Sequence, residues 1–218
     1  MYPYTIIDLM LLDENQAGSN IQKQRKIIES AIDLFAEKGY ANTTTSEIAK
    51  AAGIAEGTFF RYYKTKDALL KAFMLTFREN VVPNISQQVI QMLKAKMFHS
   101  FEELLTFFMK DRLIFIRDNR KAFKVFVKEL YYREDFRAEC LPQLDNEDLK
   151  RYANEILNHA KAKGEISDLP NSIIFRTFGI LSISYFVGRF TILPDNLFLE
   201  DDYEIDILVK QIMSALRV

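Results

Sequence analysis

Residues 39–70, GYANTTTSEIAKAAGIAEGTFFRYYKTKDALL, decide the fold of this chain. Thr44 and Glu47 have the spacing of a capping box, in which each side chain satisfies a backbone N–H group at a helix start. Gly53 stands where a tight turn requires a positive φ, with short helical patterns on both sides. The stretch therefore predicts two short helices with a tight turn between them, a helix-turn-helix motif at about 44–63.

Helical periodicity continues outside this motif. Hydrophobic residues make up 49% of the 218 residues, and seven Gly and five Pro leave little material for turns. Runs of β-branched residues typical of strands are missing, so the sequence predicts an all-α fold of about ten helices. The expected helices lie at about 21–38, 44–52, 55–63, 68–82, 84–97, 101–118, 120–136, 149–163, 171–190 and 202–216.

Composition argues against several classes of protein. The single cysteine, Cys140, excludes an internal disulfide, and with only His99 and His159 beside it we expect no metal site. The chain has no Glu-x-x-His pair, no Ser-His-Asp set and no phosphate loop, so an enzyme built on a helical bundle is the weaker alternative, and no cofactor is expected.

Charge supports nucleic-acid binding only locally. The formal net charge is −1, but residues 20–71 carry nine Lys and Arg against six Asp and Glu. The positive excess therefore lies around the helix-turn-helix motif.

The same window resembles the amino-terminal domain of the TetR family of bacterial transcriptional regulators. The matching elements are Gly39-Tyr40, Thr43-Thr44, Ile48-Ala49, Ala52-Gly53-Ile54, the run from Gly57 to Tyr63, and Lys66-Asp67-Ala68-Leu69. The resemblance covers about residues 21–70. It implies a three-helix DNA-binding domain there and a larger helical domain for effector binding and dimerisation at 71–218, with residues 1–20 as an extension.

The resemblance also implies which residues bind double-stranded operator DNA. They are Thr43, Thr44, Gly57, Thr58, Phe59, Arg61, Tyr62, Tyr63 and Lys66. Thr43, Thr44 and Lys66 are expected on phosphates, and Gly57, Thr58 and Arg61 toward base edges or the groove wall, while Tyr62 and Tyr63 fall where the family has backbone-contacting and packing aromatics. Thr44 acting only as a cap, Arg61 only in a salt bridge and Tyr63 only in the core remain the alternatives.

Three residues depart from the family pattern. Phe60 replaces a tyrosine that reaches a phosphate, Ala55 replaces a Ser or Thr cap, and Glu56 replaces a frequent lysine. We therefore expect an unusual operator preference, and a regulator that binds a protein partner with weakened DNA binding stays open.

The second half is rich in aromatic residues, which favours a packed core. The resemblance adds an effector pocket, whose aromatic lining would suit a lipophilic or aromatic small molecule. The candidate lining residues are Phe108, Arg112, Phe115, Phe126, Arg176 and Phe178. Arg112 and Arg176 are candidates to orient an anionic group, or equally partners in buried ion pairs.

The helices at 171–190 and 202–216 are expected to form a homodimer contact, with internal core as the alternative. Arg176 and Arg189 make the apolar run at 173–193 costly as a membrane span. The expected function is that of a cytoplasmic repressor that binds a palindromic operator as a dimer and releases it when an effector binds.

Residues 1–20 are apolar and acidic, and no Lys or Arg precedes Lys23. With Asp8 interrupting the apolar run, a signal peptide is not expected. The segment either packs on the protein or precedes a true start at Met10.

Overall fold

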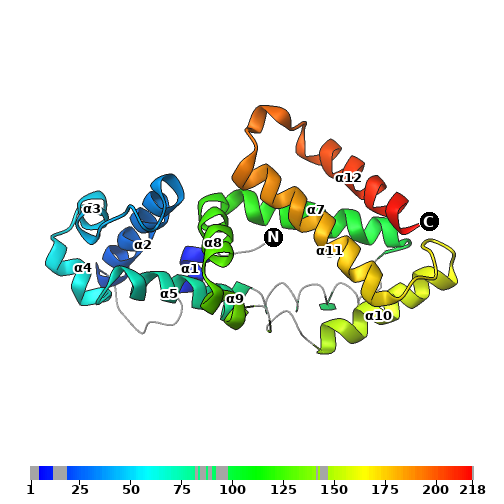
Figure 1. The fold of residues 1–218 in the computed structure, drawn as a ribbon, viewed down its shortest axis with the longest axis horizontal. Coiled ribbons are helices and arrows are strands. Elements are labelled where there is room, and N and C mark those ends of the chain that lie inside the picture. The colour runs from blue at the N-terminus through cyan, green and yellow to red at the C-terminus, as the bar shows by residue number, and fades with distance from the viewer. Residues whose placement is uncertain are drawn as a thin grey trace. The chain divides into compact units, whose positions relative to one another are not determined.

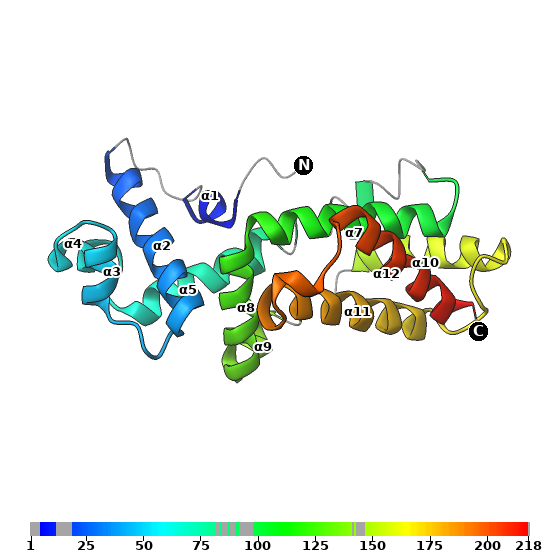
Figure 2. The ribbon, with the colours of Figure 1, turned by 90° about the horizontal axis from the view of Figure 1, so that it is seen from above.

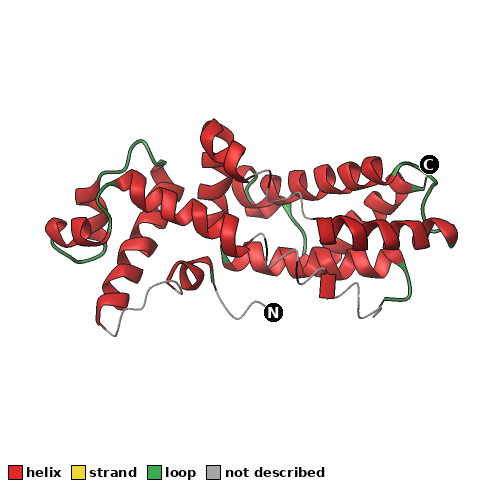
Figure 3. Ribbon diagram, turned by 90° about the horizontal axis from the view of Figure 1, so that it is seen from below, coloured by secondary structure: helices red, strands yellow, loops and turns green. Residues whose placement is uncertain are grey.

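A computed structural model describes residues 5–11, 19–81, 83, 87, 90–91, 98–140, 142 and 147–217. Every regular element in these ranges is helical, and no strand occurs among them (Figure 3). The all-α prediction is confirmed. The helix expected at 84–97 lies mostly outside the described residues.

The chain divides into two compact units. The amino-terminal unit comprises Tyr2–Pro83 and Asn119–Gln143, and the carboxy-terminal unit comprises Asn84–Asp118 and Leu144–Val218. The domain boundary expected after residue 70 stays a prediction, but the sequence did not indicate that residues 119–143 return to the amino-terminal unit.

The amino-terminal unit is built around one long helix. Its elements are α1 (Ile6–Leu11), α2 (Ser19–Lys38), α3 (Thr45–Ala51), α4 (Glu56–Tyr62), α5 (Lys66–Thr76), the π-helical turn η1 (Phe77–Val81), α8 (Arg120–Tyr132) and α9 (Glu134–Cys140). α2 packs against α1, α3 and α8, and α3 and α4 lie together beside it (Figure 2). The helix expected at 120–136 is interrupted at Arg133, whose backbone is extended.

Two glycines set the ends of the helices in this unit. Gly39 ends α2 with φ of 87°, and Gly53 turns the chain between α3 and α4 with φ of 67°. Both values lie in the left-handed region that a residue with a Cβ atom rarely adopts. The turn predicted at Gly53 is confirmed.

The carboxy-terminal unit contains α7 (Phe101–Asp118), α10 (Glu147–Ala162), α11 (Asn171–Val187) with its π-helical extension η3 (Gly188–Ile192), the 3-10 turn η4 (Asp195–Leu197) and α12 (Asp201–Leu216). α12 runs along α7, and α11 contacts α7, α10 and α12 (Figure 1).

The packing of α12 corrects one expectation. Its apolar stripe, assigned from the sequence to a subunit contact, is buried inside this unit. Its members are Ile205, Val209, Ile212, Met213 and Leu216. Because α12 packs along α7 and these side chains are buried without a second subunit, the internal-core alternative holds for this stripe.

Candidate nucleic-acid interface

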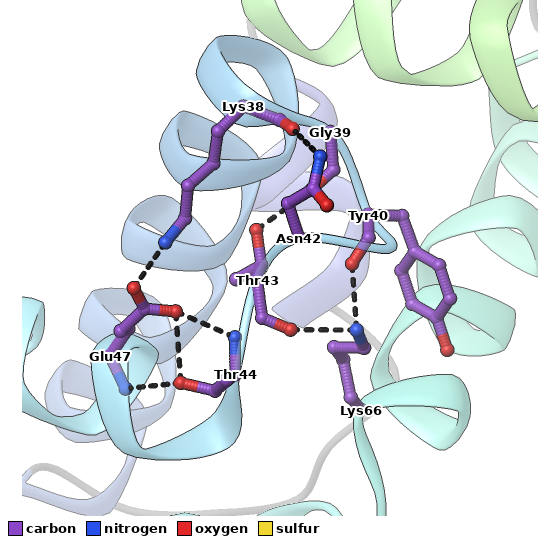
Figure 4. A network of polar contacts seen from close by, with 8 residues as sticks. All are labelled: Lys38, Gly39, Tyr40, Asn42, Thr43, Thr44, Glu47 and Lys66. Carbon is purple, nitrogen blue, oxygen red and sulfur yellow. Dashed lines mark hydrogen bonds and ion pairs between the residues drawn. The ribbon is translucent and has the colours of Figure 1, made fainter.

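The start of α3 is held by the predicted capping box (Figure 4). Thr44 Oγ1 accepts from the Glu47 N–H at 3.2 Å, and Glu47 Oε2 accepts from the Thr44 N–H at 2.8 Å. Lys38, at the end of α2, forms an ion pair with the same carboxylate. These contacts to its charged form lower the pKa of Glu47 from 4.5 to about 2. The cap therefore remains ionised at any physiological pH.

The loop before α3 is fixed from the other side by Lys66, the first residue of α5 (Figure 4). Its Nζ donates to the carbonyl oxygens of Tyr40 at 2.7 Å and Thr43 at 2.6 Å. The same Nζ lies 4.2 Å from the centroid of the Tyr40 ring. Burial lowers the pKa of Lys66, against the opposing influence of Glu129 and Glu47. Two of the three ammonium protons thus hold protein carbonyls, so Lys66 is a support of the loop whether or not it also meets a phosphate.

The α4 helix has a buried face and an exposed face. Phe59 and Tyr63, one turn apart, are buried, and their rings lie 6.2 Å from each other. Gly57, Phe60 and Arg61 are exposed on the opposite side. This is the amphipathic arrangement of a helix that packs on its domain with one face and offers the other to a partner.

Two tyrosines attach α4 to α2. The Tyr62 hydroxyl donates to the Asn20 carbonyl at 3.1 Å, and the Tyr63 hydroxyl accepts from Gln24 Nε2 at 3.3 Å. Tyr62 is half-buried, so part of its ring remains accessible.

Burial corrects the expected role of three residues. Thr43, Phe59 and Tyr63 were implied to contact DNA, but the structure buries all three inside the unit. The Thr43 hydroxyl donates to the Gly39 carbonyl at 2.9 Å, so it serves the turn and not a phosphate. Of the other implied residues, Thr44, Gly57 and Arg61 are exposed, and Thr58, Tyr62 and Lys66 are half-buried.

Ala55 and Glu56 stand at the start of α4. No side-chain hydrogen bond caps the helix at Ala55. Glu56 Oε1 accepts from the Thr45 hydroxyl at 2.9 Å, which ties the first residue of α4 to the first residue of α3. This contact between the helix starts could not be read from the sequence, because neither residue belongs to a local pattern with the other.

The candidate effector residues do not form one cluster. In the carboxy-terminal unit the rings of Phe108 and Phe178 lie 5.7 Å apart, and the guanidinium of Arg112 lies 5.6 Å from Phe108 and 5.8 Å from Phe115. Arg112 is buried and paired with Asp111, so the ion-pair alternative holds for it.

The other two candidates lie elsewhere. Phe126 belongs to the amino-terminal unit, where its ring stacks on Phe77 at 4.1 Å, and Arg176 is exposed on α11. The set of six is therefore not supported as a single lining.

A cavity of about 480 Å³ lies between α7 and α10 in the carboxy-terminal unit, and none of the six candidates lines it. Its apolar lining is formed by Phe98, Phe101, Leu104, Ile156 and Ala160, and its polar lining by His99, Ser100, Glu155, His159, Lys163 and Glu165. Its size is within the usual range for small-molecule pockets. Both histidines lie on this cavity, which the sequence did not indicate because they are 60 positions apart.

No group of three His, Cys, Asp or Glu side chains in the described part of the chain could hold a metal ion. Residues Asn171–Ile192 are long and apolar enough to cross a membrane by length and composition, with a mean hydropathy of 1.3. Only 22% of this window is buried in the structure. Arg176 and Arg189 within it make it costly as a membrane span.

Comparison with known proteins agrees with this geometry. Residues 27–73 match the family of bacterial regulatory proteins named tetR. The HTH-type transcriptional regulator YerO of Bacillus subtilis is 27% identical over 71% of this chain and 57% of its own length. The fatty acid metabolism regulator protein of the same organism is 29% identical over 71% of this chain and 79% of its own. This chain thus spans little more than half of the length of YerO.

A solved structure extends the likeness to the fold of both units. The transcriptional regulator FadR from Bacillus subtilis, in complex with stearoyl-CoA, matches with a TM-score of 0.54 at 19% identity. The match covers 88% of this chain and 97% of that one.

Proposed function

We propose that this chain, whose residues 27–73 match the TetR family of bacterial transcriptional regulators, is a cytoplasmic, effector-responsive repressor and not an enzyme. In this proposal a homodimer binds a palindromic operator through α3 and α4, and an apolar effector bound in the carboxy-terminal unit releases it. Two recognition helices about 34–36 Å apart would meet successive major grooves.

The exposed face of α4 carries the proposal of DNA binding. Arg61 lies on it, and no hydrogen bond or ion pair holds its guanidinium among the residues that the structure describes. Arg61 is therefore available for a guanine edge or a phosphate, whereas Lys38 and Lys66 nearby are already engaged. The Thr44 hydroxyl donates to Glu47 at 2.9 Å, so a phosphate would have to compete for it.

Arg61→Ala tests this proposal. With a duplex selected by the protein from a random-sequence pool, we expect a loss of about 1–3 kcal/mol in binding free energy if Arg61 reads a base. Fluorescence anisotropy across a salt series distinguishes the roles, because loss of a phosphate contact also flattens the salt slope by about one unit. Arg151→Ala, on exposed α10, is the matched control and should bind like the wild type. Equal binding by the Arg61 variant would refute a role of this face in DNA recognition.

Phe60 favours the second candidate function. Its ring is 47% exposed on the same face of α4, where an apolar side chain suits a protein partner better than a phosphate. A chain that selects no duplex from the pool would support this partner-binding regulator.

The proposed effector is a long-chain fatty acyl compound. Support comes from the relative named as a fatty acid metabolism regulator and from the stearoyl-CoA complex of FadR, together with the cavity between α7 and α10, whose apolar side is formed by Phe98, Phe101, Leu104, Ile156 and Ala160. An apolar chain would displace water from this lining, which favours binding.

Ala160→Trp tests whether this cavity receives the effector. Ala160 lines the cavity, so an indole there should fill part of it and raise the palmitoyl-CoA concentration needed to release DNA by about tenfold or more, which corresponds to roughly 1.4 kcal/mol. Ala162→Trp, on the exposed side of the same helix, is the control and should respond normally. The readout is the anisotropy of a labelled duplex during the titration. An unchanged response of a folded Ala160 variant would move the effector site elsewhere in the unit.

A further inference from the structure

The segment that precedes the DNA-binding helices forms a short helix with its own cap. The Thr5 N–H donates to Asp8 Oδ2 at 2.8 Å, and the Asp8 N–H donates to Thr5 Oγ1 at 3.2 Å. This reciprocal pair of hydrogen bonds caps the start of α1, which is a short helix. Of the first twenty residues, those of α1 pack on the protein.

The α1 helix is part of the core of the amino-terminal unit. Ile6, Leu9, Met10 and Leu11 are buried, and Ile6 is inaccessible to solvent. α1 packs against α2, α5 and η1. Its side chains therefore fill space between the long helix that supports α3 and α4 and the helix that follows them.

Two polar links fix α1 in this position. Asp8 forms an ion pair with Arg25 of α2 at 2.5 Å. In the same first turn of α1, the buried N–H of Ile6 donates to Asn119 Oδ1 at 2.9 Å. Asn119 occupies the N-cap position of α8, yet its side chain does not cap that helix. The amide oxygen that would ordinarily cap α8 holds α1 instead.

Asn119, which accepts the hydrogen bond from Ile6, lies at the boundary between the two units in the sequence. The carboxy-terminal unit ends its first segment at Asp118, and Asn119 is the first residue of the chain's return to the amino-terminal unit. The first turn of α1 therefore joins the start of α8, through the buried hydrogen bond of Ile6, to α2, through the ion pair of Asp8.

We propose that α1 is a brace that couples the start of α8 to the DNA-binding helices, with Asn119 and Asp8 as positioning residues for DNA binding. The proposal rests on the proposed function for its DNA readout. A change in the position of Asn119 would reach α2 through α1, and α2 carries α3 and the tyrosine contacts of α4.

Asn119→Ala in the full chain removes the acceptor for the Ile6 N–H. We expect the affinity for the selected duplex to fall about fivefold, the effect of one net hydrogen bond of about 1 kcal/mol. The salt slope should stay unchanged, because no phosphate contact is lost. Asn119→Asp, whose carboxylate oxygen still accepts from Ile6, should restore most of the affinity.

Amide hydrogen exchange measures the stability of α1 and α2 without DNA. Failure of the brace and failure of the proposed function can therefore be distinguished. Asn119→Ala should speed exchange in α1 and also in α2, and Arg25→Gln, which leaves α8 untouched, should do the same. Faster exchange confined to α1, or unchanged duplex affinity in a folded variant whose wild type binds, would overturn the proposal. If the wild type selects no duplex, the proposed DNA-binding function is refuted. Faster exchange in both α1 and α2 of the variants would still support the brace.

Discussion

Phe59→Ala is expected to lower the free energy of unfolding of the amino-terminal unit by about 3–5 kcal/mol. Phe59 is 0% exposed, and its ring packs against Phe60 at 5.6 Å and Tyr63 at 6.2 Å. Truncation leaves a cavity under α4 that the rigid pair of short helices cannot close. Because whole domains have only about 5–15 kcal/mol of stability, DNA binding should be lost at physiological temperature.

The neighbouring phenylalanine gives a matched control. Phe60 has the same side chain one position further on α4 but is 47% exposed, so Phe60→Ala should cost less than about 1 kcal/mol. Urea unfolding followed by circular dichroism measures both variants. If the two substitutions cost the same, α4 does not pack on the unit through the face that carries Phe59 and Tyr63.

The helix-turn-helix could be predicted because its signals are local. The capping box joins residues three apart, and the turn at Gly53 depends on one backbone angle, so both are encoded within a few positions. Phe59 and Tyr63 are four apart and Arg61 lies between them, which already separates a core face from an outer face. The family resemblance implied DNA binding for all three residues. Helical periodicity alone would have placed Phe59 and Tyr63 on the core face and only Arg61 on the outer face.

The contacts that hold the candidate DNA-binding helices in place join residues that are far apart in the sequence. They could therefore not be predicted from local sequence patterns. Lys66 binds carbonyl oxygens 23 and 26 positions away, and Asn119 binds an amide 113 positions away. A side chain's type shows that it can donate or accept, but only the packing of the helices selects its partner.

The same limit explains the errors in the second half. The amphipathic stripe of α12 correctly indicates that one face is covered, but periodicity does not say whether α7 or a second subunit covers it. Phe126 and Phe108 are equally aromatic, yet the chain places them in different units.

The outer face of α11 remains the proposed dimer contact, extended by the segment that follows it. The exposed large apolar residues there are Phe175, Ile180, Ile183, Ile192, Leu193, Leu197, Leu199 and Tyr203. Exposed large apolar side chains in such number on neighbouring segments are typical of a subunit interface.

Ile180→Glu combined with Ile183→Glu is expected to make the protein monomeric and to weaken its binding to a palindromic duplex by about 100-fold or more. The two side chains are 60% and 63% exposed on one face of α11, so charges there spare the fold of the unit while burying two carboxylates at the contact. Each monomer keeps its own half-site contacts, and the loss reflects the missing second half-site, since linking two sites raises avidity by about 10²–10⁴.

Sedimentation equilibrium measures the oligomeric state, and anisotropy measures binding to the palindrome and to a single half-site. Leu75→Glu places the same charge on an exposed apolar position of the amino-terminal unit and should leave the dimer intact. The double variant should bind the single half-site like the wild type, because α3 and α4 are unchanged. A double variant that still sediments as a dimer would place the subunit contact outside this face of α11.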